Sequence, residues 1–286
     1  MPADVSTLNR TDDALPAGGH GHTPADDSEE SAASWSPMGS QRVIVALPAY
    51  NEGQALGPLL DNVRKAMDTA RIPYEVLVVD DGSQDDTAQV AAQASFTMPV
   101  TLIEHGVNRG LAAALRTGFD AAVELARPGD VIVTMDADNT HPPALIPRML
   151  SMVREGHDVV IASRFQSGAR VVGVPWHRNL LSYGARALFQ TAFPIRGVRD
   201  YTCGFRAYRE DVLRRALEHF GDSFVSETGF SCMADVLLKL RTFPLIMGEA
   251  PLILRYDQKG GASKMRVART VWQTLTLIAR RRVRGA

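Results

Sequence analysis

The chain has 286 residues, of which 45% are hydrophobic and 22% are charged, and its formal net charge is −1. This length suffices for one large domain or two small ones. Two cysteines, Cys203 and Cys232, are too few for a disulfide framework and fit a reducing compartment. The polar N-terminus predicts no signal peptide. No run approaches the roughly 18–20 apolar residues of a membrane span, so we expect any membrane contact to be peripheral.

The charges are distributed unevenly along the chain. Residues 1–40 hold seven acidic residues and one basic residue, are rich in Ala, Ser, Gly and Pro, and lack hydrophobic periodicity. We therefore expect a disordered acidic tail over residues 1–40. From Arg255 onward the chain instead holds nine basic residues and one acidic residue.

Apolar strands alternate with amphipathic helices from Arg42 onward. Strands are expected at 42–50, 74–83, 100–105, 130–138 and 158–163 and near 245–254. Helices are expected at 53–70, 85–93, 111–126 and 142–155 and near 177–193, 209–219 and 229–240. This alternation predicts an α/β fold, with a mainly parallel sheet covered by helices on both faces.

Polar residues gather where the first five predicted strands end. They occupy positions 48–52, 80–81, 108–110, 136–138 and 163–164. In parallel sheets the ligand crevice lies beyond the carboxyl ends of the strands. The segment "DDGSQDD" by itself fits a turn and a helix cap equally well. Convergence of five strand ends favours a ligand site.

Two acidic residues, Asp136 and Asp138, end the strand in "VIVTMDADNTHPP". The glycine-rich phosphate motifs of the common nucleotide folds are missing. An anionic ligand at such an acidic site requires a cation between them. A hard divalent ion whose shell a diphosphate completes fits this requirement. An unmetallated surface turn is the alternative.

Six motifs stand in the order seen in one enzyme family. They are "ALPAYNE", "VLVVDDGSQDDT", "NRGLAAALRTG", "MDADNTHPP", "ASRF" and "DYTCGFRAYR". The chain resembles family 2 glycosyltransferases of the Rossmann-like GT-A fold over roughly residues 42–282. Within that family it is most similar to dolichol-phosphate mannosyltransferases and bacterial polyprenyl-phosphate glycosyltransferases. The resemblance implies a nucleotide-diphosphate-sugar donor and inverting transfer.

The resemblance also implies roles for individual residues. Those matching the nucleotide-sugar site are Pro48, Tyr50, Glu52, Val79, Asp80, Asp81, Asp136, Ala137, Asp138, Arg164 and Lys264. Those matching the Mg²⁺ or Mn²⁺ site are Asp136, Asp138 and Thr140. Those matching the acceptor-phosphate site are Arg178 and Ser182. The expected catalytic residues are Asp138, Arg164 and Lys264.

The sequence departs from the family pattern at several positions. Gln258 stands where an arginine usually precedes Lys264 by six residues, which puts donor-phosphate binding there in doubt. Cys203 replaces a serine, and we expect a small buried substitute rather than a reactive thiol. Asp235 and Glu227 either orient the acceptor or pair on a helix. For Asp235 we favour a structural role.

The acceptor is inferred from the charges available. A hydroxyl acceptor needs a general base, whereas a phosphate is already an anion and needs cations, such as Arg164 and Arg178, to position it. His141 follows the acid pair, but we expect it to pack in the loop. These residues favour a phosphate acceptor. Together with the resemblance, they imply sugar transfer from a nucleotide-diphosphate sugar, GDP-mannose or a UDP-hexose, to a polyprenyl or dolichyl phosphate. A hydroxyl acceptor on a polysaccharide, glycolipid or small molecule, and a nucleotide-sugar-binding protein without turnover, are the alternatives.

The expected domain organisation is a catalytic GT-A domain at 41–264 followed by a basic amphipathic helix at 265–286. That helix either lies on an anionic membrane face or packs on the body. Its basic run is short and lacks stacking aromatics, so we do not expect nucleic-acid binding. The expected location is the cytoplasmic membrane face, with a membrane-embedded protein as a further candidate partner.

Overall fold

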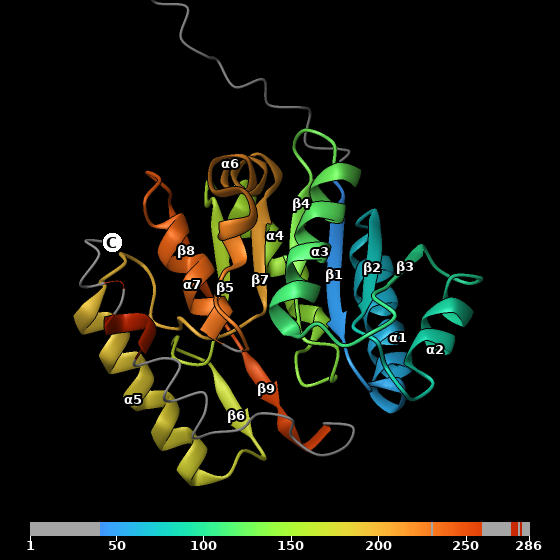
Figure 1. Cartoon of the computed structure of the whole chain (residues 1–286), viewed down its shortest axis with the longest axis horizontal. Helices are drawn as coiled ribbons and strands as arrows, with labels where there is room; N and C mark the ends of the chain where they lie inside the picture. The colour runs from blue at the N-terminus through green and yellow to red at the C-terminus, as the bar shows by residue number, and fades with distance from the viewer. Residues whose placement is uncertain (1–40, 230, 259–275, 280, 282–286) are drawn as a thin grey trace, which may run out of the picture. The chain divides into compact units, whose positions relative to one another are not determined.

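The structure, a computed structural model, describes residues 41–229, 231–258, 276–279 and 281 (Figure 1). Its strands are β1 (Val43–Ala49), β2 (Tyr74–Asp80), β3 (Val100–Glu104), β4 (Val131–Thr134), β5 (Val159–Ser163), β6 (Arg170–Val172), β7 (Arg206–Arg209), β8 (Met247–Pro251) and β9 (Ile253–Arg255). Its α-helices are α1 (Gly53–Ala70), α2 (Thr87–Ala94), α3 (Leu111–Leu125), α4 (Ile146–Arg154), α5 (Trp176–Ala192), α6 (Glu210–Phe220) and α7 (Ser231–Leu240). Three short 3₁₀ helices are η1 (Pro143–Leu145), η2 (Gly221–Val225) and η3 (Tyr256–Gln258). The expected tail at 1–40 and Lys264 lie outside the described residues.

The main sheet has the strand order β3-β2-β1-β4-β7-β5-β8. Neighbouring strands run parallel except at β7, which is antiparallel to both β4 and β5. A separate two-stranded sheet pairs β6 with β9 in parallel. The predicted α/β class with a mostly parallel sheet is therefore confirmed.

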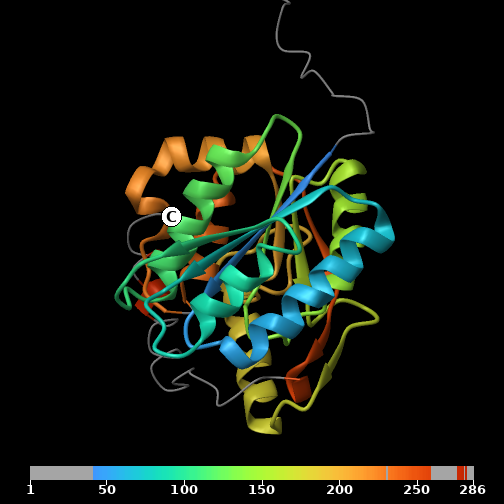
Figure 2. The same ribbon diagram turned by 90° about the vertical axis from the view of Figure 1, so that its right-hand side faces the viewer.

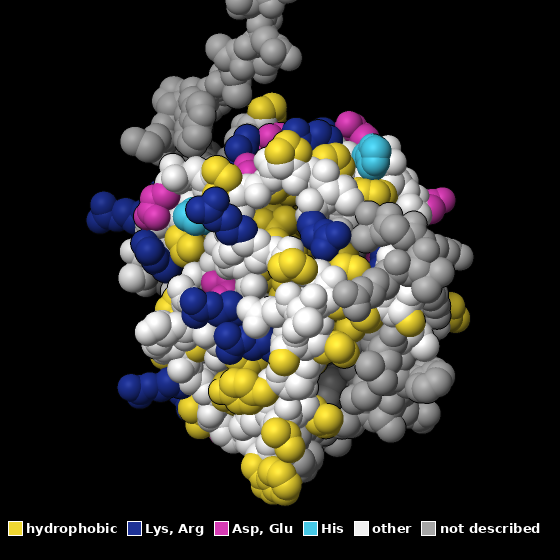
Figure 3. Space-filling model, turned by 90° about the vertical axis from the view of Figure 1, so that its left-hand side faces the viewer, with side chains coloured by type: hydrophobic (Ala, Val, Ile, Leu, Met, Phe, Trp, Pro, Cys, Tyr) yellow, Lys and Arg dark blue, Asp and Glu magenta, His cyan; other side chains and the backbone are white. Residues whose placement is uncertain are grey.

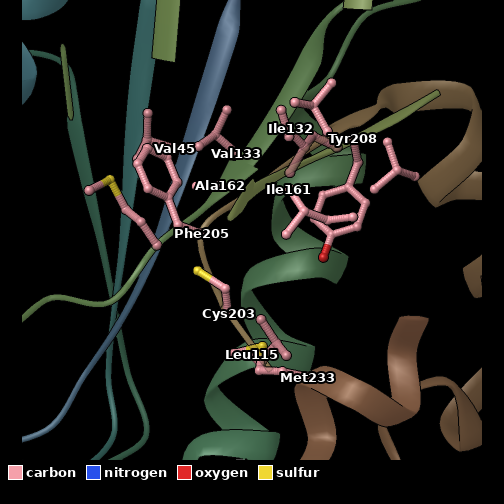
Figure 4. Packing of buried hydrophobic residues seen from close by; sticks show 14 of the residues in the cluster. Val45, Leu115, Ile132, Val133, Ile161, Ala162, Cys203, Phe205, Tyr208 and Met233 are labelled. Carbon is pink, nitrogen blue, oxygen red and sulfur yellow. The ribbon is translucent and has the colours of Figure 1, made fainter. Parts of the chain in front are cut away.

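Helices cover both faces of the main sheet. Helices α1 and α4 contact each other on one face, and α3 and α6 contact each other on the opposite face (Figure 2). The central strands β1, β4 and β5 are continuous apolar runs because both of their faces are buried. Figure 4 shows Val45, Val133 and Ile161 from these strands in one core with Leu115 of α3 and Met233 of α7.

The strands differ from the expected elements in two ways. Strands β6 and β7 were not predicted, whereas the helix expected near 209–219 is α6. Arg206 explains why β7 was missed, because this arginine is fully buried within a strand of four residues. The single strand expected near 245–254 is divided, since β8 joins the main sheet while β9 leaves it to pair with β6.

The end of the chain packs on the body where it is described. Residues 276–279 and 281 are helical, and Leu277 and Ile278 are buried. Arg281 donates a hydrogen bond of 2.6 Å to the buried carboxylate of Asp235 on α7. This part of the expected basic helix therefore contacts protein. No helix in the described ranges is long and apolar enough to cross a bilayer.

Candidate active site

The acid pair lies in the loop that connects β4 to η1. Oδ1 of Asp138 accepts hydrogen bonds from the backbone N–H and the hydroxyl of Thr140, at 3.1 and 2.7 Å. Asn139 has a φ of 60°, a left-handed conformation that asparagine tolerates better than most residues. Ala137 is buried between the two acids. Thr140 therefore orients Asp138 within a tight turn.

The other acid, Asp136, lies against the segment that leads into β7. A Cβ atom at Gly204 would stand 3.1 Å from Oδ1 of Asp136, so the missing side chain makes room for the carboxylate. The backbone N–H of Asp136 donates to Nδ1 of His141 at 3.3 Å, and the His141 ring stacks on Phe205 with 5.4 Å between centroids. The prediction that His141 packs within the loop is confirmed.

The acidic turn after β2 holds the loop between β3 and α3. Oδ1 of Asp81 accepts a hydrogen bond from the N–H of Arg109 at 2.9 Å and lies 2.8 Å from Nδ1 of His105. Oδ2 accepts from the N–H of Gly110 at 2.8 Å. Both oxygens of this buried carboxylate thus fix the neighbouring loop, which is a positioning role.

The loop after β1 is joined to the same turn. The N–H of Ser83 lies 3.3 Å from each oxygen of Asp80, and Oγ of Ser83 accepts from the N–H of Asn51 at 2.8 Å. Oδ1 of Asn51 accepts in turn from the N–H of Gln84 at 2.7 Å. These bonds bring the acidic turn beside the predicted nucleotide-contacting residues Pro48, Tyr50 and Glu52. The side chain of Val79, by contrast, is fully buried in the core.

Arg164 follows β5 and is held by an acid that the sequence analysis missed. Nε and Nη2 of Arg164 donate to the two oxygens of Asp200, at 2.8 and 2.7 Å, and Nη2 also donates to the hydroxyl of Thr202 at 2.6 Å. Asp200 opens the motif "DYTCGFRAYR", so a sequence signal existed. It could not be assigned to Arg164 because β7, which brings the two segments together, was not foreseen.

The electrostatics connect the acid pair to this arginine. Burial alone would lower the pKa of Arg164, but the carboxylate of Asp200 outweighs burial, and Asp136 adds to the upward shift. Burial also raises the pKa of Cys203 and of Cys232 to about 12. Both thiols therefore stay protonated at neutral pH and are poor nucleophiles. The prediction that Cys203 is a buried structural residue is confirmed.

Helix α5 carries both residues predicted to bind the acceptor phosphate. Ser182 is half-buried, and the side chain of Arg178 lies outside the described part of the structure. Residues four apart share a helix face, so Arg186 lies on the same face. The guanidinium carbons of Arg186 and Arg164 lie 4.9 and 5.6 Å from the centroid of the Phe165 ring. This ring therefore links α5 to the end of β5.

Another part of α5 is apolar and exposed. Large exposed apolar side chains on this helix are Trp176, Leu180, Leu181, Tyr183 and Leu188, and Val172 and Ile253 on the β6–β9 pair are also exposed. Residues 165–199 contain five arginines and no acidic residue. Hydrophobic and basic side chains lie together on this side of the molecule in Figure 3. The surface thus combines apolar area with arginines from a segment that holds no acidic residue.

The residues around the acid pair fit a hard divalent cation. The carboxylates of Asp136 and Asp138 and the hydroxyl of Thr140 supply oxygen atoms, which Mg²⁺ and Mn²⁺ prefer. Among the described residues, no group of three or more His, Cys, Asp or Glu side chains is placed to hold a metal. A cation here would therefore need further oxygens, as Mg²⁺ does when one or two carboxylates and substrate phosphates share it.

Comparison with known protein families decides the class of enzyme. Residues 44–217 match the family described as Glycosyl transferase family 2. The chain belongs to this family. The match runs from β1 into α6 and includes the acid pair, Arg164 and Asp200. The polar residues that follow the strands of this glycosyltransferase therefore lie within the part of the chain that matches the family.

Curated relatives extend the similarity. The glycosyltransferase is 33% identical over 240 residues to dolichol-phosphate mannosyltransferase of Pyrococcus furiosus, covering 84% of this chain and 63% of that protein. It is 34% identical over 228 residues to polyprenol monophosphomannose synthase of Mycolicibacterium smegmatis, covering 79% and 82%. It is 36% identical over 225 residues to undecaprenyl-phosphate mannosyltransferase of Micrococcus luteus, covering 78% and 87%. The chain thus spans less than two thirds of the Pyrococcus protein and most of the other two.

Solved structures agree with the fold. Glucosyl-3-phosphoglycerate synthase of Mycobacterium tuberculosis, in complex with Mn²⁺, UDP and glucosyl-3-phosphoglycerate, matches with a TM-score of 0.56 and 20% identity, over 84% of this chain and 78% of that chain. The same enzyme with Mg²⁺ and UDP also matches with a TM-score of 0.56. At this identity the likeness concerns the fold alone, which is GT-A as predicted.

Proposed function

We propose that this glycosyltransferase transfers a hexose from a nucleotide-diphosphate sugar, GDP-mannose or a UDP-hexose, to a polyprenyl phosphate with inversion. The observation that carries the proposal is the Arg164 guanidinium, which Asp200 holds beside the acid pair and which reaches α5 through Phe165. The names of the three relatives, each a mannosyltransferase or mannose synthase for a polyprenyl or dolichyl phosphate, support the same acceptor.

In the proposed reaction a phosphate oxygen of the acceptor forms a bond to the anomeric carbon. The bond from that carbon to the donor diphosphate breaks, and the nucleoside diphosphate leaves with the electron pair. The attacking oxygen of a phosphate dianion carries no proton, so no general base is required. Arg164, Arg178 and Ser182 bind and orient the acceptor phosphate, and Lys264 contacts the donor diphosphate. Donors aimed at these oxygens stabilise charge more effectively than water does.

A divalent cation, Mg²⁺ or Mn²⁺, is part of the proposal. Asp136, Asp138 and Thr140 would hold it together with the donor diphosphate, and the ion supplies electrostatic stabilisation of the leaving group. Strand β9 ends at the same loop, because the backbone N–H of Arg255 donates to the carbonyl of Thr140 at 3.0 Å. Lys264 itself lies outside the described residues.

Transfer to a hydroxyl acceptor is the second candidate, and it needs a base. His141 is next to the acid pair, but it is buried, stacks on Phe205 and accepts from the N–H of Asp136. His105 is likewise engaged by Asp81 and by the hydroxyl of Thr117, 2.9 Å from its Nε2. Both ring nitrogens of His105 and Nδ1 of His141 are therefore engaged. An aspartate or glutamate can also act as a general base, so the choice between the two acceptors rests on the transfer experiment.

We also propose that the protein binds the cytoplasmic face of a membrane. The apolar and arginine-bearing surface of α5 supports this contact, since anionic lipids attract basic, amphipathic helices. A membrane-embedded protein is a further candidate for the same side. The proposed boundaries are a tail at 1–40, a catalytic domain at 41–264 and a basic helix at 265–286.

The test is transfer of radiolabel from a panel of nucleotide sugars to three acceptors with one purified enzyme. The acceptors are a polyprenyl phosphate, the matching polyprenol and a soluble sugar. The proposal predicts product with the polyprenyl phosphate alone. Product with the polyprenol or the soluble sugar supports the hydroxyl acceptor instead, and donor binding without any product supports a binding protein.

A further inference from the structure

Asp200 stands at the centre of a buried network between β5 and β7. Its side chain is fully buried, and its two oxygens accept from Nε, Nη2 and the backbone N–H of Arg164. Oδ1 also accepts from the N–H of Cys203 at 3.1 Å. The N–H of Asp200 donates in turn to Oε1 of Glu249 at 2.7 Å. The carboxylate is therefore anchored by backbone on two sides.

These hydrogen bonds involve only one edge of the Arg164 guanidinium, the edge formed by Nε and Nη2. A guanidinium has five N–H donors in a rigid plane. Nε and Nη2 are committed to Asp200 and Thr202, whereas Nη1 makes no hydrogen bond within the described residues. The side chain of Arg164 is 20% exposed, although that of Asp200 is 0% exposed. Asp200 thus fixes the plane and hence the direction of Nη1.

We infer that Asp200 is a positioning residue that aims Nη1 of Arg164 at the anionic oxygen of the acceptor. The inference deepens the proposed function and rests on it for the identity of the acceptor. Charge alone would not place a carboxylate here, because Asp200 cancels the charge of Arg164 and repels an incoming phosphate. The bidentate pair explains why a carboxylate stands here, since two parallel hydrogen bonds between a guanidinium and a carboxylate fix the orientation of the guanidinium as well as stabilising it.

The substitution Asp200→Asn separates geometry from charge. Asparagine keeps the volume and one acceptor oxygen for the N–H of Cys203, but it breaks the fork and adds one unit of positive charge to the site. Positioning predicts an acceptor KM raised about ten- to a hundredfold with donor affinity unchanged, because misplacing a binding group by about 1 Å can cost that much. A lowered acceptor KM would show that the carboxylate acts only through its charge, and an unchanged acceptor KM would show that it does not act on the acceptor. Either result would overturn the inference.

Two comparisons isolate the effect. In an Arg164→Ala background, Asp200→Asn should change acceptor KM less than twofold, since the group it positions is gone. A further large change there would overturn the inference. Asp130→Asn is the matched control, because Asp130 is also buried and pairs with Arg42 at 3.0 and 3.1 Å away from this site, at the start of β4. It should lower the melting temperature without changing acceptor KM.

A measurement without substrate keeps this test independent of the proposed acceptor. The Arg164 Nε–H resonance, assigned by its loss in Arg164→Lys, should exchange slowly with water in the unaltered chain and rapidly in Asp200→Asn. Rapid exchange in the unaltered chain would overturn the inference, even if the variant does not fold. Slow exchange of the Arg164 Nε–H proton together with no transfer to polyprenyl phosphate would overturn the proposed acceptor. It would not contradict the positioning of Arg164 by Asp200.

Discussion

Replacing Asp235 by alanine should destabilise the protein, because this fully buried carboxylate joins three elements. Oδ2 of Asp235 accepts from Nζ of Lys239 at 2.5 Å and from the hydroxyl of Ser226 at 3.0 Å. Oδ1 accepts from Arg281 at 2.6 Å. Burial already lowers the pKa of Lys239, and the partner carboxylate opposes that shift. Alanine would leave Lys239, whose side chain is 4% exposed, without the carboxylate that pairs with it.

Removing one partner of a buried ion pair costs about 3–5 kcal/mol. For a domain of this size each kcal/mol lowers the melting temperature by about 2–4 °C, so the expected fall is about 6–20 °C. Calorimetry or thermal circular dichroism measures it. The matched control is Asp61→Ala, whose pair with Arg64 at 2.8 Å has an aspartate side chain that is 56% exposed. An exposed pair contributes about 0–1 kcal/mol, so this variant should melt almost normally.

The opposite pattern would refute the structural role of Asp235. If Asp235→Ala melted like the unaltered protein but raised the acceptor KM, the residue would orient the acceptor. The sequence left that role open as an alternative for Asp235.

Three further predictions concern the proposed metal site, the buried Glu249 and the exposed surface of α5. Asp138→Ala should abolish turnover while keeping the melting temperature. EDTA should abolish turnover of the unaltered enzyme, because both treatments remove the proposed cation. Full activity in either experiment would contradict the metal assignment. Burial raises the pKa of Glu249 above its ordinary 4.5, so the folded state holds this proton to higher pH than the unfolded state. Stability should therefore fall as pH rises through the shifted pKa. Glu249→Gln should melt at an equal or higher temperature at pH 7 and lose this pH dependence, which thermal melts from pH 4 to 8 will test. Replacing Trp176 and Leu180 by serine should reduce co-sedimentation with anionic vesicles by more than about tenfold, since burying each of these side chains in the membrane contributes about 1.5–3 kcal/mol. The control is Phe96→Ser, which should bind vesicles normally. Phe96 follows α2 and its side chain is 88% exposed.

The parts of the fold that local sequence patterns determine were predicted correctly. Strands β1, β2, β4 and β5 are apolar runs that end in polar residues, and parallel strands bring those ends to one edge. The placement of Asp136 and Asp138 after β4 followed from this rule. The turn that orients Asp138 through Thr140 lies within the predicted motif as well.

The parts that depend on distant contacts were missed. "RAYR" does not resemble a central strand, because Arg206 is buried only by donating to the carbonyls of Met233 and Tyr201, at 2.7 and 2.8 Å. Without that strand the sequence could not place Asp200 beside Arg164. The apolar surface of α5 was missed for a related reason, since a helical pattern does not tell which side chains the body covers.

The fate of the acceptor phosphate oxygens tests the proposed reaction most directly. A polyprenyl phosphate labelled with ¹⁸O at its three non-bridging oxygens is incubated with the enzyme and the active nucleotide sugar, and the products are analysed by mass spectrometry. Attack by a phosphate oxygen on the anomeric carbon predicts a glycosyl phosphate lipid that retains all three labels and an unlabelled nucleoside diphosphate. Loss of a label from the lipid product, label in the nucleoside diphosphate, or sugar attached only to a hydroxyl group would contradict it.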